Sequence, residues 1–418
     1  MIEAHQGCRP RESAMTNLSL FLTESADMYP GAVALRCEGV TTTYSELADQ
    51  AARFAAYVCT HDVQPGDRVG IMLGNRPEFA AAFYGILHAG AVAVLLDPLR
   101  SARETQMALM NTNARLLFFA AGCAPVATKA ALAAGASPIE LDYDTLDVLT
   151  DDFAGRPRPV SRAADDDAVI VHQFGKTGAL RGAELTHANL VTTQAVIARS
   201  VLDLGPEDVV LGCLPLFHAF GLTCGLMAAI CTGSTLVLLP GFDARRALEM
   251  VAAQRVTVIE AAPSMYTEML ATVDRCGLEL GSLRVCISCG PALPGDTRRR
   301  YEERFGCVLL EGHGLSDSAP AACFNRPGKL RKMGSVGSPV NGVQIRVVDE
   351  RRKEVPVGTT GELRVRGHNV MKGYWNQPEA TAAAIVEGWL CSGETGFVDD
   401  DGYFYIVDCT ATPSPGRC

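Results

Sequence analysis

The segment from residue 67 to residue 96 most constrains the fold that this chain can adopt. Two short apolar runs, Asp67–Leu73 and Ala91–Leu96, flank a stretch with helical character over Pro77–Ala89. A strand, a helix and a second strand with short connections form a βαβ unit, in which the strands run parallel and helices cover the sheet faces. The segment therefore predicts an α/β fold built on a parallel sheet.

The same alternation of strands and helices returns along the chain. At 418 residues, the chain is longer than a single hydrophobic core usually supports. We therefore expect two or more subdomains. Further strands are predicted, with amphipathic helices between several of them, at residues 115–120, 209–214, 235–239, 257–260 and 284–288.

After Gly334 the pattern changes to shorter strands separated by Gly and Pro turns, as at 343–348 and 361–366. This texture indicates a small β-subdomain over roughly residues 334–408. Residues 1–14 are polar and lack periodicity, so we interpret them as a disordered leader, and residues 409–418 have the composition of a disordered tail. The folded domain is expected over residues 15–408.

Composition argues against several classes of function. The formal net charge is −10 at pH 7, whereas proteins that follow nucleic-acid phosphates carry concentrated positive charge. Cys286-Ile287-Ser288-Cys289 is the only CxxC pair among the 15 cysteines, and no second pair or histidine cluster accompanies it, which argues against zinc. No apolar run has transmembrane length and no secretory signal occurs. A cytoplasmic protein without a nucleic-acid partner or a transmembrane segment is predicted.

A glycine-rich segment between Val169 and Leu190 is the first candidate site. It contains Gly175, Gly178 and Gly182, with positive charge from Lys176 and Arg181, and a helix is expected to begin at Thr186. Glycines let successive backbone amides point toward one anion, so the segment suits a polyphosphate. A glycine-rich surface loop is an equal alternative. A Walker A loop is excluded, because Ile170 stands where its first glycine would be.

Together with later segments, residues 174–182 resemble the phosphate loop of the adenylate-forming superfamily, which includes acyl-CoA synthetases, luciferases and peptide-synthetase adenylation domains. The family sequence is Ser/Thr-Gly-Thr-Thr-Gly-x-Pro-Lys-Gly, where this chain has Phe-Gly-Lys-Thr-Gly-Ala-Leu-Arg-Gly. The resemblance implies an N-terminal domain of two parallel-sheet α/β subdomains and a distorted β-barrel. It also implies that ATP phosphates contact Gly175, Lys176, Thr177, Gly178, Arg181 and Gly182.

Two more segments resemble the family's nucleotide motifs. Cys289–Pro294 is similar to the loop along the adenine edge, which implies contacts from Gly290, Pro291 and Ala292. Residues 312–317 are similar to Gly-Tyr-Gly-Leu-Thr-Glu. This second match implies that His313, between Gly312 and Gly314, stacks on adenine, that Ser316 touches the α-phosphate and that Asp317 holds Mg²⁺. Asp317 is one methylene shorter than the family's glutamate, which would weaken the metal site.

The acid site and the ribose site are also implied by resemblance. Leu214–Leu222 is similar to the mouth of the family's acyl pocket and makes His218, Phe220 and Gly221 substrate-binding candidates; a lone histidine is otherwise more often a core residue. Relatives have Thr-Gly-Asp, whose aspartate accepts both ribose hydroxyls, where this chain has Ser392-Gly393-Glu394. The longer side chain of Glu394 is expected to enter the space of the sugar. Residues 361–367 and 370–375 match framework motifs.

At the family's Asp-Arg hinge this chain has Asp408-Cys409, and the sequence ends at Cys418. The expectation is a fatty-acyl-CoA synthetase-like protein that uses ATP, Mg²⁺ and CoA, without the C-terminal lid domain and therefore impaired. Alternatives are an active ligase completed by another chain, and a non-catalytic protein that binds an acyl group or a nucleotide. The expected substrate is a medium to long fatty acid, with aryl acids second, and a homodimer is compatible with the resemblance.

Overall fold

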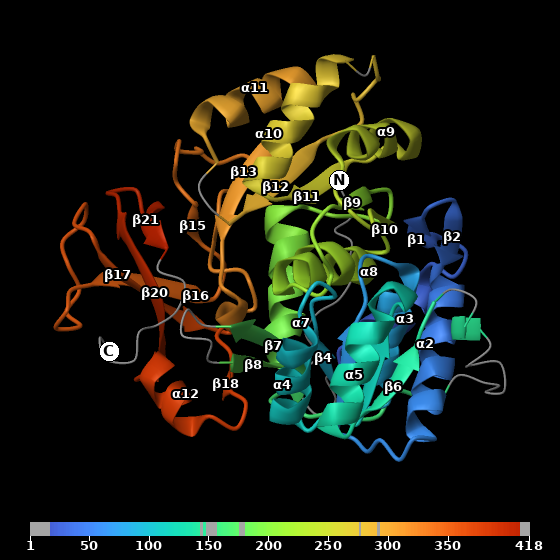
Figure 1. Ribbon diagram of the computed structural model, residues 1–418. Helices are drawn as coiled ribbons and strands as arrows, with labels where there is room; N and C mark the ends of the chain where they lie inside the picture. Colours follow the sequence, from blue (N-terminus) through green and yellow to red (C-terminus); the bar gives the residue numbers. More distant parts are fainter. Residues whose placement is uncertain are drawn as a thin grey trace.

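The structure of the protein is a computed structural model that describes residues 17–142, 145–147, 157–174, 180–275, 277–290 and 293–409. These residues form three sheets (Figure 1). Two of them are mixed sheets with long parallel stretches and the third is antiparallel. The predicted α/β fold with a small β-subdomain is therefore confirmed.

The first sheet has nine strands in the order β15-β14-β13-β12-β11-β9-β10-β1-β2. Its strands from β13 to β1 run parallel, and the outer pairs are antiparallel. The strands are β1 (Val33–Cys37), β2 (Val40–Thr43), β9 (Val209–Gly212), β10 (Thr235–Leu238), β11 (Val258–Ala261), β12 (Val285–Cys289), β13 (Val308–His313), β14 (Cys323–Phe324) and β15 (Ser338–Pro339).

The second sheet has seven strands in the order β18-β8-β7-β4-β3-β5-β6, parallel from β7 to β6. It contains the predicted βαβ unit, in which β3 and β4 pair in parallel on either side of α3 (Pro77–His88). The strands are β3 (Arg68–Met72), β4 (Val92–Leu95), β5 (Leu116–Phe119), β6 (Ser137–Glu140), β7 (Asp167–Phe174), β8 (Leu180–Thr186) and β18 (Gly373–Tyr374).

The third sheet is the curled antiparallel sheet at the left of Figure 1. It contains the strand that carries Glu394. Near its lower end lies α12 (Pro378–Ala384). Its strands are β16 (Val343–Val348), β17 (Gly361–Gly367), β19 (Ile385–Val386), β20 (Trp389–Val398) and β21 (Phe404–Cys409).

The main core lies between the two large sheets. Alternate residues of β3 and β4 enter this core, and α3 within it is buried on every side. A helix that is apolar all round belongs in the interior, which explains its composition. The elements packed into this inner layer are α1 (Leu20–Met28), α2 (Tyr44–Cys59), α3, α7 (His187–Val196), η2 (Ile197–Val201), η3 (Gly221–Met227) and α8 (Ala228–Thr232).

Other helices cover the outer faces of the two sheets. α9 (Ala244–Gln254), α10 (Pro263–Thr272) and α11 (Gly295–Phe305) pack on the nine-stranded sheet, and α4 (Ala102–Thr112) and α5 (Ala124–Ala134) pack on the seven-stranded sheet. Short 3₁₀ turns are η1 (Ala121–Cys123), η4 (Val273–Arg275) and η5 (Ser316–Ser318). No helix of the described residues is both long enough and apolar enough to cross a membrane.

Local sequence sets several helix starts. Thr43 caps α2 and pairs with Glu46 in a capping box. The expected start at Thr186 is confirmed, because its side chain accepts from the Asn189 amide and caps α7. Such caps satisfy amides that the first turn leaves unpaired. Each cap is also the last residue of the strand before its helix, β2 for Thr43 and β8 for Thr186.

Candidate active site

The segments that were expected to bind ligands follow the carboxyl ends of parallel strands. The glycine-rich segment follows β7, the His218 segment follows β9, and Gly290 and His313 lie at the ends of β12 and β13. Asn75, after β3, joins the two large sheets at this edge: its Nδ2 donates to the Leu214 carbonyl at 2.9 Å. Open α/β sheets bind ligands outside the carboxyl ends of their strands. This edge is the candidate active site.

The glycine-rich segment is a hairpin rather than a single long loop. β7 and β8 pair antiparallel on either side of residues 175–179, so the predictions for Gly175, Lys176, Thr177 and Gly178 lie outside the described residues. The placement of Gly182 in the loop was wrong, because Gly182 lies inside β8 opposite His172. A Cβ at this position would lie 2.9 Å from the Ile170 side chain, so close packing accounts for this glycine.

Asp317 is the centre of a buried polar cluster that joins three strands of the second sheet. Its Oδ1 accepts a hydrogen bond from Gln173 Nε2 at 2.7 Å, and its Oδ2 accepts one from the Tyr374 hydroxyl at 2.8 Å. The Arg181 guanidinium lies 5.1 Å from the centre of the Tyr374 ring. Ser316, the first residue of η5, is half-buried beside Asp317. The predicted catalytic residues Arg181, Ser316 and Asp317 therefore lie in one place.

Burial and the neighbouring polar groups shift the pKa of Asp317 in opposite directions. Burial raises the pKa of Asp317 to about 6, while the Tyr374 hydroxyl, the Arg181 charge and the Gln173 amide act to lower it. Burial and the neighbouring carboxylate raise the pKa of Tyr374. Because its pKa is raised, Tyr374 keeps its proton near neutral pH and donates it to the Asp317 carboxyl group.

The described residues do not by themselves present a magnesium site. Both oxygens of Asp317 already accept hydrogen bonds, and among the described residues no group of three or more His, Cys, Asp or Glu side chains could hold a metal. Mg²⁺ often uses only one or two carboxylates together with phosphates and water. Mg²⁺ at Asp317 would share the carboxylate with the Gln173 amide and the Tyr374 hydroxyl, and it would supply positive charge beside the phosphates.

His313 and Glu394 meet directly, which changes the expected roles of both. His313 Nε2 lies 2.5 Å from Glu394 Oε2, and the two side chains are only 10% and 6% exposed. The pair joins the end of β13 to β20 of the curled sheet. Glu394 thus contacts the residue that was expected to stack on adenine, while the expectation that its carboxylate enters the space of the sugar stays a prediction.

Two glycines near this pair are required by packing. A Cβ at Gly312 would overlap the ring of Phe324, and a Cβ at Gly314 would overlap the Pro320 carbonyl. Gly290, at the end of β12, has φ +123°, a conformation that favours glycine. Pro291 and Ala292 lie outside the described residues, so the predicted adenine loop is described only at its first residue.

The predicted acid-binding residues lie where the chain turns from β9 into η3. Phe220 stacks on Phe324, with ring centroids 6.4 Å apart and an angle of 12° between the planes. A Cβ at Gly221 would overlap the carbonyl of Pro215, so only glycine allows this turn. His218 is exposed, and its ring packs against Phe217 with centroids 4.7 Å apart. Of the three, Phe220 and Gly221 face the inner layer.

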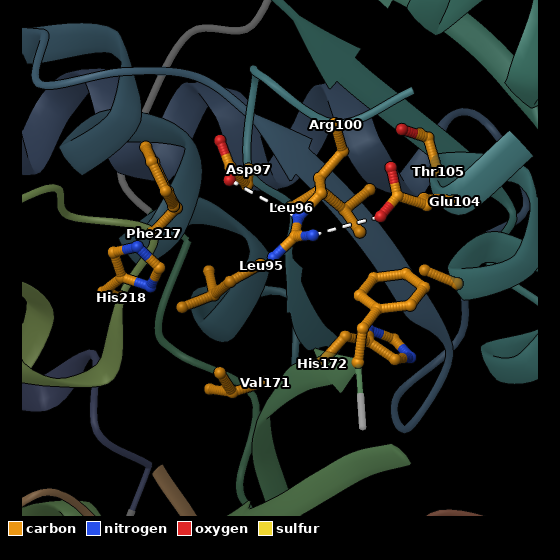
Figure 2. Close-up of a pocket in the computed structure, with 12 residues that line it drawn as sticks. Leu95, Leu96, Asp97, Arg100, Glu104, Thr105, Val171, His172, Phe217 and His218 are labelled. Carbon is orange, nitrogen blue, oxygen red and sulfur yellow. Dashed lines mark hydrogen bonds and ion pairs between the residues drawn. The ribbon is translucent and has the colours of Figure 1, made fainter. Parts of the chain in front are cut away.

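A pocket that sequence reasoning missed opens between His218 and the second sheet (Figure 2). Arg100 lies along it and contacts Asp97 at 3.5 Å and Glu104 at 3.0 Å. Burial lowers the pKa of His172 to about 4, so this ring is neutral at pH 7. The pocket is lined by Leu95, Leu96, Asp97, Arg100, Glu104, Thr105, Ala108, Val171, His172, Phe174, Phe217 and His218.

Three residues of the site had sequence signals that were passed over. Tyr374 belongs to a motif that was interpreted as framework alone, yet its hydroxyl contacts Asp317. Gln173 is a polar residue at the end of an apolar strand, just before the glycine-rich turn. Arg100 follows β4 at the carboxyl edge, and its guanidinium lies 4.9 Å from the Phe174 ring. The shared signal was a polar side chain within or close to the end of a strand.

The sequence is similar to known families and proteins. Residues 22–375 match the family model described as AMP-binding enzyme. A long-chain-fatty-acid–CoA ligase of Bacillus subtilis strain 168 is 30% identical over 439 residues, which cover 96% of this chain and 78% of that protein. A feruloyl-CoA synthase of an Amycolatopsis species is 35% identical over 384 residues, which cover 92% of this chain and 76% of that protein.

The fold is similar to solved structures as well. The crystal structure of ATP-bound MatB from Rhodopseudomonas palustris superposes with a TM-score of 0.87 and 28% identity, covering 95% of this chain and 79% of that one. Like the two relatives above, it extends beyond the aligned region. The similarity in sequence and the similarity in fold therefore both extend over more than nine-tenths of this chain.

Proposed function

This chain belongs to the AMP-binding enzyme family, and from that premise we propose that it activates a carboxylic acid with ATP and transfers the acyl group to CoA. The similar chains described above are named as acyl-CoA ligases of different acids, which supports the general reaction. The observation that carries the proposal is the convergence of Arg181, Asp317 and Tyr374 at the carboxyl edge of the second sheet. Arg181 brings positive charge to this edge.

The chemistry explains why such a charge would matter. A carboxylate oxygen bonds to the α-phosphorus of ATP and pyrophosphate leaves; the thiol of CoA then attacks the acyl carbon, loses its proton and expels AMP. Both reactants of the first step are anions, so a fixed donor where charge concentrates is worth roughly 3–4 kcal/mol. In this proposal Arg181 supplies it, Ser316 contacts the α-phosphate, and Asp317 with Gln173 and Tyr374 holds the hairpin in position.

We propose that the acid has a fatty-acyl body, with an aryl acid as the second candidate. The segment after β9 supports an apolar acyl group, since every residue of η3 is buried and Phe220 stacks on Phe324. Acids of both classes occur in the names of similar proteins. His218 would lie at the entrance, because it is exposed and borders the pocket of Figure 2.

We further propose that this chain binds nucleotides weakly. The supporting observation is the bond between His313 and Glu394, which engages the ring expected to stack on adenine and the carboxylate expected to accept the ribose hydroxyls. A nucleotide would have to separate the two. The same observation favours a second candidate function, a non-catalytic protein that binds an acyl group or a nucleotide.

Calorimetry and turnover together test these functions. The chain is titrated with AMP, with ATP and with non-hydrolysable acyl-AMP analogues, and pyrophosphate release and thioester formation are then assayed with a panel of acids. A ligase gives acid-dependent pyrophosphate release, reduced roughly a hundredfold in Arg181→Ala. Binding of acids without any pyrophosphate release supports the non-catalytic function. Failure of acids and nucleotides alike to bind contradicts both.

A further inference from the structure

Glu260 is a buried carboxyl group that the activation chemistry does not use. It lies in β11, in the middle of the nine-stranded sheet, and is 0% exposed. Neither of its oxygens has a hydrogen-bond partner among the residues that the structure describes. Burying a polar group without a partner costs free energy, and most buried polar side chains are paired. An unpaired carboxyl in the core therefore calls for an explanation.

The alternation of β11 shows which way Glu260 points. Ile259 and Ala261 belong to the outer core under α9 and α10, whereas Val258 belongs to the inner core between the two large sheets. Side chains alternate along a strand, so Glu260 faces the inner core with Val258. A Cβ at Gly225 of η3 would overlap Glu260 Oε1. The carboxyl group therefore points at Gly225, a position of η3 that has no side chain.

The register of the sheet relates Glu260 to both ligand segments. Glu260 pairs with Gly212 of β9, whose strand leads into the segment of His218 and Phe220, and with Ile287 of β12, whose strand leads to Gly290. Cys289, at the end of β12, is influenced by the charges of both Glu260 and Glu394. Glu260 thus lies on the inner side of the site, between the acid segment and the predicted nucleotide segment.

We propose that Glu260 is a specificity-determining residue of the acid site and that it selects acids whose acyl group carries an amino group. The inference rests on the proposed function, because it takes the η3 side of the site to hold the acyl group. The inference restricts the proposed fatty or aryl acids to those that carry a cationic group far from the reacting carboxylate. The partner that the described chain does not supply would come from the substrate.

Charge balance supports an amino group over a plain hydrocarbon. Burial raises the pKa of Glu260 well above its usual value, and no arginine, lysine or histidine of the described chain counteracts this. The titratable groups whose pKa values respond to its charge are the thiols of Cys213, Cys224 and Cys289, and burial raises these pKa values too, so the thiols remain neutral. An alkyl chain would leave the carboxyl group unpaired, whereas an ammonium would ionise it and form a charged hydrogen bond.

The competing explanation is packing, in which Glu260 only fills the space beside Gly225. A neutral glutamic acid and a leucine have similar volumes, so packing alone predicts that Glu260→Leu leaves acid preference unchanged. It also predicts that ligand binding moves no proton. The two explanations therefore differ in observables that do not depend on turnover.

The test compares acids in matched pairs by calorimetry on the full chain. Hexanoate is compared with ω-aminohexanoate, and para-methylbenzoate with para-(aminomethyl)benzoate. The wild-type chain is expected to bind an aminated acid at least about tenfold more tightly than its partner, the range of a hydrogen bond to a charged group. Glu260→Leu should reverse this preference and Glu260→Gln should abolish it. Glu78→Gln removes another buried carboxyl with a raised pKa, in α3, and should keep it.

Proton release provides a second readout. An ammonium that ionises Glu260 near neutral pH releases up to one proton, which titrations in buffers of different ionisation enthalpy detect, and Glu260→Gln should release none. Equal binding of the members of each pair, with no effect of Glu260→Leu, overturns the inference and leaves the proposed function in place. Failure of every acid to bind overturns the proposed function and the inference with it.

Discussion

Asp317 and Glu260 are both carboxyl groups in the interior, yet their surroundings are opposite. Asp317 accepts hydrogen bonds from Gln173 and Tyr374 and lies near the charge of Arg181, whereas Glu260 has no partner in the described part of the chain. Burial raises the pKa of both. At one place the protein stabilises its buried carboxyl group with its own donors, and at the other it leaves this to a ligand.

The difference has a structural origin. Asp317 lies in a short 3₁₀ turn, where Gln173 of β7 and Tyr374 of β18 both reach it as donors. Glu260 lies within a central strand, flanked by two parallel neighbours and covered by η3. A strand interior offers its backbone groups only to the ladder, so a side chain there depends on the opposite layer. The residue of that layer against Glu260 is Gly225, which has no side chain to offer.

The largest expected effect is the loss of stability when Asp317 is removed. Asp317→Leu leaves the Tyr374 hydroxyl and the Gln173 amide buried without an acceptor, at about 1–3 kcal/mol for each unpaired group. We expect the free energy of unfolding in urea to fall by about 4 kcal/mol at pH 7. Asp317→Asn keeps an acceptor and is the matched control. A loss below about 1 kcal/mol would mean that the cluster does not hold the hairpin.

The pH dependence of stability should come next in size. The pKa of Asp317 is raised from 3.8 to about 6, so the folded state favours its protonated form. The additional stability gained by protonating Asp317 in the folded state is present below about pH 4 and is lost as pH rises through about 6, which amounts to about 3 kcal/mol. The hydrogen bonds that Asp317 accepts from Gln173 and Tyr374 are separate from this contribution. The difference in unfolding free energy between the wild-type chain and Asp317→Asn, measured across this range, isolates the effect. A difference in unfolding free energy that does not change with pH would contradict this prediction.

A substitution of Glu260 is expected to change stability in the opposite direction. Replacing an unpaired buried carboxyl group by an apolar side chain removes a desolvation cost of about 1–3 kcal/mol. Glu260→Leu should therefore stabilise the free chain by about 2 kcal/mol, measured by urea unfolding at pH 7. Glu260→Gln keeps an unpaired polar group and should give little gain. Destabilisation by Glu260→Leu would show that Glu260 has a partner in the free protein and would remove the contrast with Asp317.

The architecture could be predicted from the sequence because strands and helices leave local patterns. The βαβ segment at 67–96 and the cap at Thr186 both formed as expected. The predictions of Arg181, Ser316 and Asp317 also brought together residues that lie in one cluster. These residues come from two motifs far apart in the chain, residues 174–182 and 312–317, so their proximity was implied by the family resemblance and not by their spacing along the chain.

The rest of the site could not be predicted because it depends on which distant side chains meet. Glu260 looked like one residue of an apolar strand, and only the register against β9 and η3 shows that it has no partner. Gly182 looked like part of a loop because a glycine pattern does not show where a strand begins. Glu394 was recognised as too long, but that it contacts His313 follows only from the position of β20 relative to β13.

The smallest effect is expected at Glu394, where a shorter side chain would separate the carboxylate from its partner His313. Glu394→Asp withdraws the carboxylate by one methylene from His313 Nε2, now 2.5 Å away, so the bond lengthens beyond hydrogen-bond range and both groups become available to a ligand. AMP affinity should rise roughly tenfold, about 1.4 kcal/mol, by calorimetry. Glu394→Gln keeps the length and the contact and should show no gain. If the aspartate variant binds AMP no better than the wild-type chain, the pair with His313 is not what limits nucleotide binding, and this third carboxylate belongs with Asp317 as a purely structural group.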